Sequence, residues 1–232
     1  MGFTSAKIAT QTLNDLMAKY QPKEFDKFKV IAYFTCAPSQ FMTVEPIKSL
    51  ADLQGKKPVL RAAGTAVEVI KPLGANVVGM AMNEVPDAVQ KNVVNGIVSS
   101  LEVLQDMNFA AYCPYATHAD LPVVTFAVVM NKKVWDSLDP QVQKAIDDMR
   151  QEHTLWTAEY EDQHVIDALA WAKEKSNHQL FQLPPADRAK IVELGKPVIA
   201  SYITRVSAGG LPGEQIVKDV YSFKEAWEKQ NP

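Results

Sequence analysis

The feature that most limits the fold of this chain is a long stretch without a helix breaker. After Asp139-Pro140, a pair typical of a helix start, residues 141–175 contain neither glycine nor proline. At ~1.5 Å per residue, a single helix of this length measures about 50 Å, whereas a compact domain has a radius of gyration of only ~13 Å. The helix must therefore span more than one domain or protrude. The apolar residues that fall mainly on one of its faces are Val142, Ile146, Met149, Trp156, Tyr160, Leu169 and Ala172.

Before this helix, short apolar runs alternate with helical patterns, a rhythm typical of βαβ units and of a sheet with parallel strands. Strands are expected at 28–34, 58–61, 75–80, 93–100 and 122–131, and helices are expected to begin near Ser5, Ser49, Thr65 and Asn83. The run Pro122–Asn131 is apolar on both faces, so we expect it at the centre of the sheet. Two further helices are expected near 185–206 and 212–229. The sequence predicts an α/β fold.

Composition and charge exclude several classes of partner. The 232 residues carry a formal net charge of −3 without a clustered basic face, so nucleic acid is not an expected partner. No run approaches the ~20 apolar residues of a membrane span. The start of the chain lacks the residue order of a signal peptide, and read literally it predicts a cytosolic protein. A disulfide between Cys36 and Cys113 stays open, but we expect two buried thiols.

Arg61 is the candidate binding residue, because it ends a predicted strand and small residues follow it. Ligands of open α/β sheets generally bind at the carboxyl ends of strands. Ala63 and Gly64 would let a ligand approach the backbone at the start of the next helix, whose free N–H groups favour an anion. The guanidinium offers a planar fork for a carboxylate, a contact that contributes roughly 1.5–3 kcal/mol. A structural ion pair or a surface arginine is the alternative.

The remaining polar residues give weaker signals. His153 and His164 lie about three turns apart on the long helix, too far apart to share one metal ion. Ser99, Ser100 and Glu102 follow a predicted strand, where they either contact a ligand or cap a helix. No nucleophile elbow, phosphate loop or metal-helix motif occurs in the sequence. We therefore predict no catalytic residue, no metal and no cofactor, and a protein that is not an enzyme.

Several segments together resemble the solute-binding receptors of TRAP (tripartite ATP-independent periplasmic) transporters, in their four-carbon-dicarboxylate-receptor branch. The segments are "IKSLADLQGKK", "LRAAGT", "LGANVVGMAMNEVPDAVQKNVVNG" and "FAVVMNKKVWDSLDPQVQKAIDD". The resemblance covers essentially the whole chain. It implies a periplasmic-binding-protein-like fold in which two lobes close on an organic acid, with the long helix crossing both. It also implies periplasmic location and membrane subunits of a TRAP transporter as partners, and a homodimer is an open expectation.

The resemblance divides the chain and assigns the site. Residues 1–42 and 126–138 are expected to form the remainder of lobe one, 43–125 lobe two, 139–175 the spanning helix, and 176–232 helices that pack on the lobes. Arg61 matches the arginine that pairs with the ligand carboxylate in this family. The full set of expected ligand-binding residues, the others placed by segment position, is Arg61, Ala63, Gly64, Phe34, Ser99, Ser100, Thr125 and Phe126.

Departures from the family pattern leave alternatives open. The start of this chain resembles the interior of a receptor, so the first strands of lobe one would be missing, and an exposed sheet edge would lower stability and favour self-association. Pro86 replaces the usual tyrosine, and Asn95-Gly96 replaces a common Asp-Gly. A non-functional or cytosolic fragment is one alternative. A small α/β enzyme acting on a carboxylate substrate is the other, with its acid or base among Glu68, Glu84 and Glu102.

Overall fold

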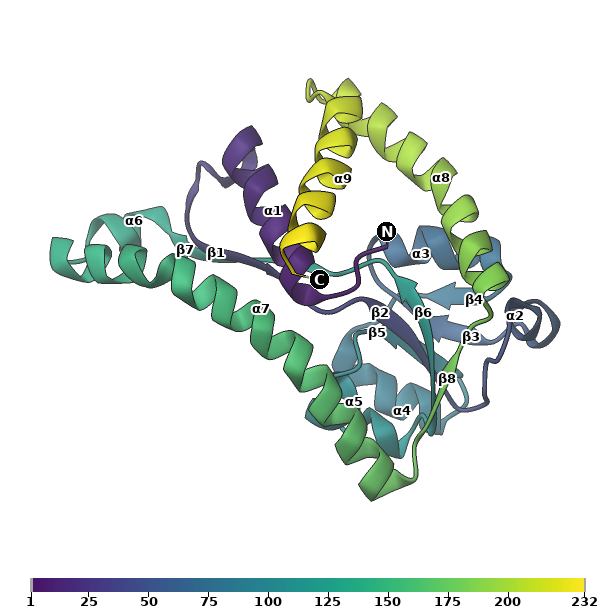
Figure 1. The fold of residues 1–232 in the computed structure, drawn as a ribbon. Coiled ribbons are helices and arrows are strands. Elements are labelled where there is room, and N and C mark those ends of the chain that lie inside the picture. Colours follow the sequence, from purple (N-terminus) through teal and green to yellow (C-terminus); the bar gives the residue numbers. More distant parts are fainter. Residues whose placement is uncertain (1, 232) are drawn as a thin grey trace.

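Two β-sheets of unequal size organise the chain (Figure 1). The computed structural model describes residues 2–231 and, within that range, every side chain except those of residues 56 and 151. The smaller sheet pairs β1 (Phe28–Thr35) with β7 (Thr125–Asn131) in antiparallel register. The larger sheet has six strands in the order β4-β3-β5-β2-β6-β8. Helices pack around both sheets, so the α/β class predicted from the sequence is confirmed.

The larger sheet is mixed rather than parallel throughout. Its strands are β2 (Ser39–Thr43), β3 (Val59–Arg61), β4 (Asn76–Val78), β5 (Gly96–Ser99), β6 (Tyr115–Leu121) and β8 (Gln179–Gln182). β3 runs parallel to β4 and β5, and β6 runs parallel to β8. β2 is antiparallel to both β5 and β6. The βαβ rhythm predicted β3, β4 and β5, whereas β2, β6 and β8 were not expected because their short runs mix polar with apolar residues.

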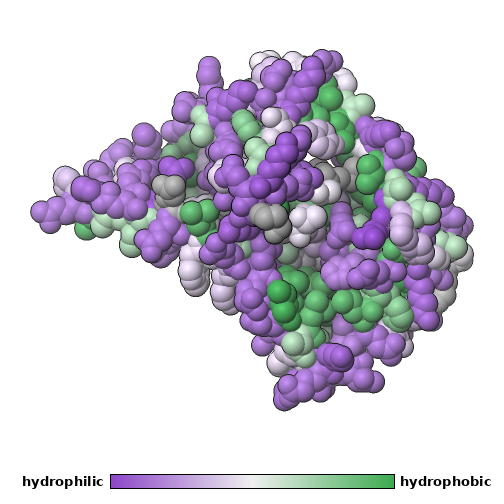
Figure 2. Space-filling view, viewed as in Figure 1, coloured by the Kyte–Doolittle hydropathy of each residue, from purple (hydrophilic) through white to green (hydrophobic). Residues whose placement is uncertain are grey.

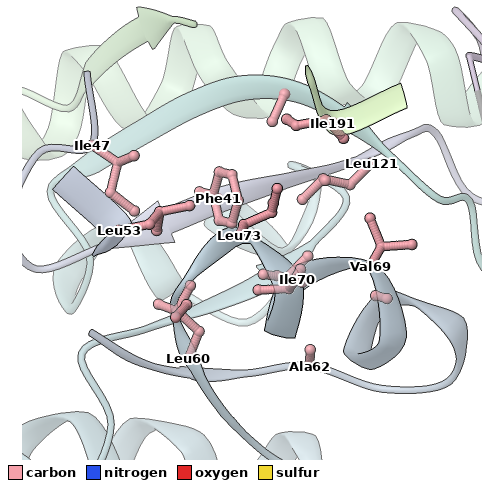
Figure 3. Close-up of a cluster of buried hydrophobic side chains, with 14 of the residues drawn as sticks. Phe41, Ile47, Leu53, Leu60, Ala62, Val69, Ile70, Leu73, Leu121 and Ile191 are labelled. Carbon is pink, nitrogen blue, oxygen red and sulfur yellow. The ribbon is translucent and has the colours of Figure 1, made fainter. Parts of the chain in front are cut away.

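Side chains on the two faces of the larger sheet form two separate hydrophobic clusters. Neighbouring residues on a strand point to opposite faces, so Phe41 lies in the first cluster and Met42 in the second. Figure 3 shows the first cluster, where Phe41 and Leu60 from the sheet lie near Ile70 and Leu73. Ala172 joins the second cluster from the long helix. Apolar side chains thus pack on both faces of the larger sheet, and this packing holds its strands and their ends in place.

The helices that follow the strands of this sheet are short. They are α2 (Leu50–Lys56), α3 (Thr65–Ile70), α4 (Val85–Gln90) and α5 (Val103–Asp106), with the 3-10 turns η2 (Lys71–Leu73), η3 (Met82–Glu84) and η4 (Phe109–Ala111). Ser49 precedes α2, and its backbone N–H donates to Asp52 Oδ2 at 3.0 Å. The expected cap of α4 at Asn83 is wrong, because the chain first forms η3 and the residue before the helix is Glu84.

The long helix α7 (Pro140–Ser176) has 37 residues, as the uninterrupted stretch predicted. Asp139 Oδ1 accepts from the N–H of Gln141 at 2.7 Å and so caps its start. α7 packs against β1 and α1 near the smaller sheet and against α5 near the larger one, so it crosses both (Figure 1). The apolar face of α7 does not coincide with its buried face. Val142, Met149, Trp156 and Tyr160 are exposed, Ile146 and Leu169 are half-buried, and the fully buried residues are Ala158, Ala168 and Ala172.

The remaining elements bring the two ends of the chain together. They are α1 (Ala6–Tyr20), η1 (Lys23–Phe25), α6 (Lys132–Asp136), α8 (Pro185–Ala208, which contains Pro197) and α9 (Gly213–Gln230). Ser5 Oγ accepts from the N–H of Ile8 at 3.1 Å, which confirms the expected cap of α1. α1 and α9 lie side by side, and Trp227 Nε1 donates to Asp15 Oδ2 at 2.8 Å between them.

β7 is not a central strand, contrary to its apolar sequence. Among the described residues it pairs with β1 alone, so one edge of β7 carries no partner strand. Phe126 and Val129 are 42% exposed and Val128 is 45% exposed. Figure 2 shows that hydrophilic side chains cover the arm formed by α6 and the start of α7, whereas apolar side chains gather beside β8. The apolar sequence of β7 therefore predicted a buried strand, whereas the described residues leave the strand partly exposed.

Candidate ligand-binding site

Arg61 lies at the carboxyl end of β3, on the edge of the larger sheet where β4 and β5 also end. In the sheet register it stands opposite Val78 of β4 and Ile97 of β5. Ser99, the last residue of β5, lies two residues beyond Ile97 on the same edge, opposite Gln40 of β2. Side chains two residues apart on a strand share a face, so Arg61, Ile97 and Ser99 lie on one face of the sheet.

The guanidinium of Arg61 is half-buried and only partly hydrogen-bonded. Its Nε donates to the carbonyl oxygen of Met80 at 3.1 Å. Within the described part of the chain this is its one hydrogen bond, and no carboxylate forms an ion pair with it. Burial lowers the pKa of Arg61, but an arginine stays charged in proteins. The Met80 carbonyl thus orients the group while both terminal nitrogens keep their donors for a ligand.

The segment after Arg61 leaves its backbone accessible. Ala63, Gly64 and Thr65 are exposed. Gly64 has φ 57°, in the region that favours glycine, and it immediately precedes α3. The expected helix from Thr65 to Gly74 is instead a six-residue α-helix followed by the turn η2. Because a helix dipole sums over its length, α3 contributes less to anion binding than the sequence suggested, and the guanidinium remains the main charge.

The two serines of the expected site differ in exposure. Ser99 is half-buried at the sheet edge, whereas Ser100 is 2% exposed. The hydroxyl of Ser100 has no hydrogen-bond partner among the described residues.

Of the acid-base candidates of the enzyme alternative, Glu84 Oε2 accepts from the N–H of Ala81 at 3.2 Å. Glu102 is 9% exposed, so it lies in the interior rather than on this edge.

Two short chain segments connect the sheets, and the aromatic residues of the expected site lie beside them on β1 and β7. Residues 36–38 join β1 to β2, and residues 122–124 join β6 to β7. The N–H of Cys36 donates to the carbonyl of Val124 at 3.1 Å and holds the two connections together. Beside them, Phe34 stacks on Phe126 with ring centroids 5.0 Å apart and planes at 16°. Thr125 stands opposite Thr35 and is exposed. A ligand that contacts both Arg61 and these rings would bridge the two sheets.

A large cavity lies away from these residues. It has a volume of about 1120 Å³ and is lined by residues of α1, β1, α7 and α9, among them Asn14, Tyr33, Leu155 and Trp227. None of the expected ligand-binding residues lines it. Acidic and basic side chains both line it, including Asp147 and Arg150, so the cavity has no single charge preference. We therefore place the candidate site at Arg61, where the chemistry favours an anion.

Several features of the site could not be found from sequence. The carbonyl of Met80 orients Arg61, but a backbone acceptor leaves no trace in a sequence pattern. Gln40 is 4% exposed, and its Oε1 accepts from the N–H groups of Ala119 and Asp120 at 2.6 and 3.0 Å, which fixes the start of β2 beside Ser99. Cys36 and Cys113 are both free thiols, as expected; Cys113 is buried and Cys36 half-buried.

Two sheets joined by paired connections and crossed by one long helix are the architecture of a periplasmic-binding-protein-like fold. More specifically, the chain belongs to family 7 of the bacterial extracellular solute-binding proteins (DctP), whose family model matches residues 2–205. No helix in the described range is both long enough and apolar enough to cross a membrane.

Solved structures that this chain resembles include TRAP solute-binding proteins. A TRAP periplasmic solute-binding protein of Desulfovibrio salexigens is 40% identical, with a TM-score of 0.86 over 98% of this chain and 70% of its own. It was crystallised in an open form with the C-terminus of a symmetry mate in its ligand-binding site. A TRAP solute-binding protein of Rhodoferax ferrireducens with copurified benzoate is 21% identical, with a TM-score of 0.91 over 99% of this chain and 73% of its own.

Relatives known by sequence are longer than this chain. A solute-binding protein of Sulfitobacter species is 23% identical over 200 residues, which are 85% of this chain and 60% of that protein. The chain therefore spans about three fifths of the length of this relative.

Proposed function

We propose that this chain binds a small organic acid through its carboxylate, at Arg61, and is the ligand-holding part of a receptor that delivers the acid to a TRAP-type membrane transporter. The observation that carries the proposal is the guanidinium of Arg61, which is oriented by Met80 and has no carboxylate partner among the described residues. A bidentate contact with a ligand carboxylate uses the donors that remain. The family is one of extracellular receptors rather than enzymes.

The two sheets suggest how such a receptor would close. We assign the smaller sheet to lobe one and the larger sheet to lobe two, with the connections 36–38 and 122–124 as the hinge. β2 (Ser39–Thr43) then belongs to lobe two, which moves the first boundary a few residues before position 42. Residues 139–175 span both lobes, and residues 176–232 supply β8 to lobe two and pack α9 against α1. A rotation at the hinge would bring Phe34 and Phe126 toward Arg61.

The aromatic pair at the hinge favours an acid with one apolar or aromatic end. The stacked pair of Phe34 and Phe126 lies at the hinge, and Phe126 is 42% exposed, so a ring of the ligand can pack against it. The D. salexigens protein holds a chain terminus in its site, and a terminus carries a carboxylate; the R. ferrireducens protein holds benzoate. We therefore expect monocarboxylates with an aromatic or apolar group to bind better than succinate. Ser99, Ala63 and Gly64 would line the part of the site that holds the ligand carboxylate, and Thr125 the part that holds the apolar end of the ligand.

A thermal-shift screen tests the proposal. The chain is heated with benzoate, pyruvate and succinate over a range of concentrations, because a ligand that binds only the folded state raises the unfolding temperature. At a concentration of 100 times the dissociation constant, the stabilisation is about 2.7 kcal/mol, or roughly 5–10 °C for a chain of this size. We expect Arg61→Ala to abolish the shift and Arg205→Ala, which removes an exposed arginine of α8, to leave it intact.

Two outcomes contradict the proposal. If one acid stabilises the wild type and Arg61→Ala equally, the acid binds elsewhere and Arg61 is not the anchor. If none of the acids shifts the wild type, the chain does not hold an organic acid by itself.

A further inference from the structure

We propose that Cys36, Glu102 and Glu161 form a binding site for a divalent metal ion of the zinc type, at the point where the two sheets meet. The three residues come from different parts of the chain: the connection between β1 and β2, the segment between β5 and α5, and the middle of α7. One potential ligand atom from each, the thiol sulfur and a carboxylate oxygen of each glutamate, lies within 4.8 Å of the other two. None of the three residues belongs to the expected ligand-binding set, and the proposal does not depend on the proposed function.

One carboxylate oxygen of Glu102 and one of Glu161 are buried without a hydrogen-bond partner among the described residues. Glu102 is 9% exposed, and the two atoms are its Oε2 and the Oε2 of Glu161. Buried polar atoms are hydrogen-bonded in the great majority of cases. Two such carboxylate oxygens in one cluster indicate a missing partner.

The charged groups around Glu102 and Glu161 are mostly acidic. The charged groups that act on Glu102 and Glu161 are each other, Asp106, Asp162 and His164. His164 is the one potentially cationic group of this set, and its Nε2 already lies 2.8 Å from Asp106 Oδ1. The carboxylate oxygens of Glu102 and Glu161 lie within 4.8 Å of each other, and like charges at this distance repel. A bound metal ion offsets this repulsion.

The donor set indicates the kind of ion. Zinc accepts thiolate sulfur at about 2.3 Å and carboxylate oxygen at about 2.0–2.2 Å, and three protein ligands with one water complete a tetrahedral site. Calcium and magnesium prefer oxygen ligands alone, so the thiol of Cys36 argues against them. Cys36 and Glu161 are half-buried rather than fully buried, which leaves the ion a path from solvent. A bound ion would tie the hinge connection to lobe two and to the spanning helix.

Cobalt(II) binding to the full chain, freed of metal with a chelator, tests the site. Cobalt reports on a sulfur ligand directly, because a cobalt–thiolate bond gives a charge-transfer absorption band in the near ultraviolet. We expect this band in the wild type, its displacement by zinc, and its presence in Cys113→Ser, which removes the other thiol. Cys36→Ser should lose the band, and Glu161→Gln should weaken cobalt and zinc binding by roughly tenfold or more.

Glu159→Gln is the matched control on α7. Glu159 pairs with Lys7 near the surface, so its loss should leave metal affinity unchanged. Circular dichroism of each variant establishes that it is folded; if Cys36→Ser does not fold, the comparison of Glu161→Gln with Glu159→Gln decides. The proposal is overturned if the wild type shows no cobalt–thiolate band. It is equally overturned if zinc binds the wild type and Glu161→Gln with the same affinity, since Glu161 is then not a ligand of the bound ion.

Discussion

At the scale of single residues, two kinds of position stand out: the charged residue of the proposed site at a sheet edge, and a small residue where two strands approach closely. Arg61 is the first kind, because the Met80 carbonyl occupies Nε alone and leaves the terminal nitrogens for a ligand. Gly96 is the second kind. It stands opposite Thr43 in the β2–β5 ladder, and a Cβ atom there would collide with the Met42 carbonyl oxygen and come within 2.8 Å of Thr43 Cα.

Gly96→Ala should therefore destabilise the fold, because neither contact involves a flexible side-chain end that can move away. We expect a loss of about 3 kcal/mol in the free energy of unfolding. Gly55→Ala is the matched control: its added Cβ meets nothing within 4 Å inside α2, so a gain of about 0.5–1 kcal/mol is expected. Urea unfolding monitored by circular dichroism measures both. Equal stability of the two variants would show that the β2–β5 pairing is not as close as described.

Arg61 could be singled out from sequence because the pattern of an apolar strand, an arginine and small residues is local. The Met80 carbonyl could not, because it is contributed by the backbone of a segment 19 residues later. The cluster of Cys36, Glu102 and Glu161 was also missed: each residue is unremarkable in its own segment, and the fold alone brings them together. Ser100 was expected at a ligand surface but is buried, because the chain turns inward after β5.

At the scale of elements, α7 shows which part of a helix a sequence predicts. Its existence and length follow from the absence of glycine and proline over residues 141–175. Its buried face does not follow, because the helix packs through Ala158, Ala168 and Ala172, where close approach requires small side chains, while Trp156 and Tyr160 stack on each other in solvent. Aromatic residues at helical spacing were therefore a misleading guide to the core.

A buried carboxylate of α9 contributes to the contact between α1 and α9. Asp219 accepts from Lys19, Tyr20 and Gln215, and these three donors, in that order, lower its pKa from 3.8 to about 2. A carboxylate with a lowered pKa in the folded state stabilises it above the unfolded value, and the stabilisation is lost as the pH falls through the folded value. The stabilising effect of Asp219 is thus present above about pH 4 and declines between pH 4 and 2.

Asp219→Asn should consequently lower the thermal unfolding midpoint at pH 7, and its difference from the wild type should shrink as the pH falls from 4 toward 2. Glu225→Gln, which removes an exposed ion pair with Lys229 on the same helix, should change the midpoint little at either pH. Melting curves followed by circular dichroism at pH 7, 4 and 3 measure this. A midpoint difference for Asp219→Asn that stays constant with pH would contradict the assigned role of the carboxylate.

At the scale of the whole molecule, the smaller sheet differs from the larger one in how completely it is covered. The larger sheet has a hydrophobic cluster on each face, whereas β7 has an unpaired edge among the described residues and exposes Phe126, Val128 and Val129. Unpaired, apolar strand edges favour association with other chains. The apolar sequence of β7 correctly predicted a strand but not its surroundings, because burial depends on neighbours that a local pattern does not specify.

We therefore expect this chain, as given, to self-associate through β7 at micromolar concentrations. Val128→Lys places a charge on the exposed strand and should shift the population toward monomer, as lysine does on natural edge strands. Val93→Lys replaces another exposed valine, outside the two sheets, and should not. Sedimentation velocity at several concentrations distinguishes them. A wild type that is monomeric throughout, with a sharp two-state melting transition, would contradict this expectation.

The carboxylate-receptor account is tested most directly by a crystal structure of the chain with the acid that gives the largest thermal shift. It predicts the ligand carboxylate within hydrogen-bond distance of both terminal nitrogens of Arg61, with the remainder of the acid directed toward Phe34 and Phe126. An acid bound instead in the cavity lined by Asn14 and Trp227, or an Arg61 side chain paired with a carboxylate of the protein itself, would contradict it.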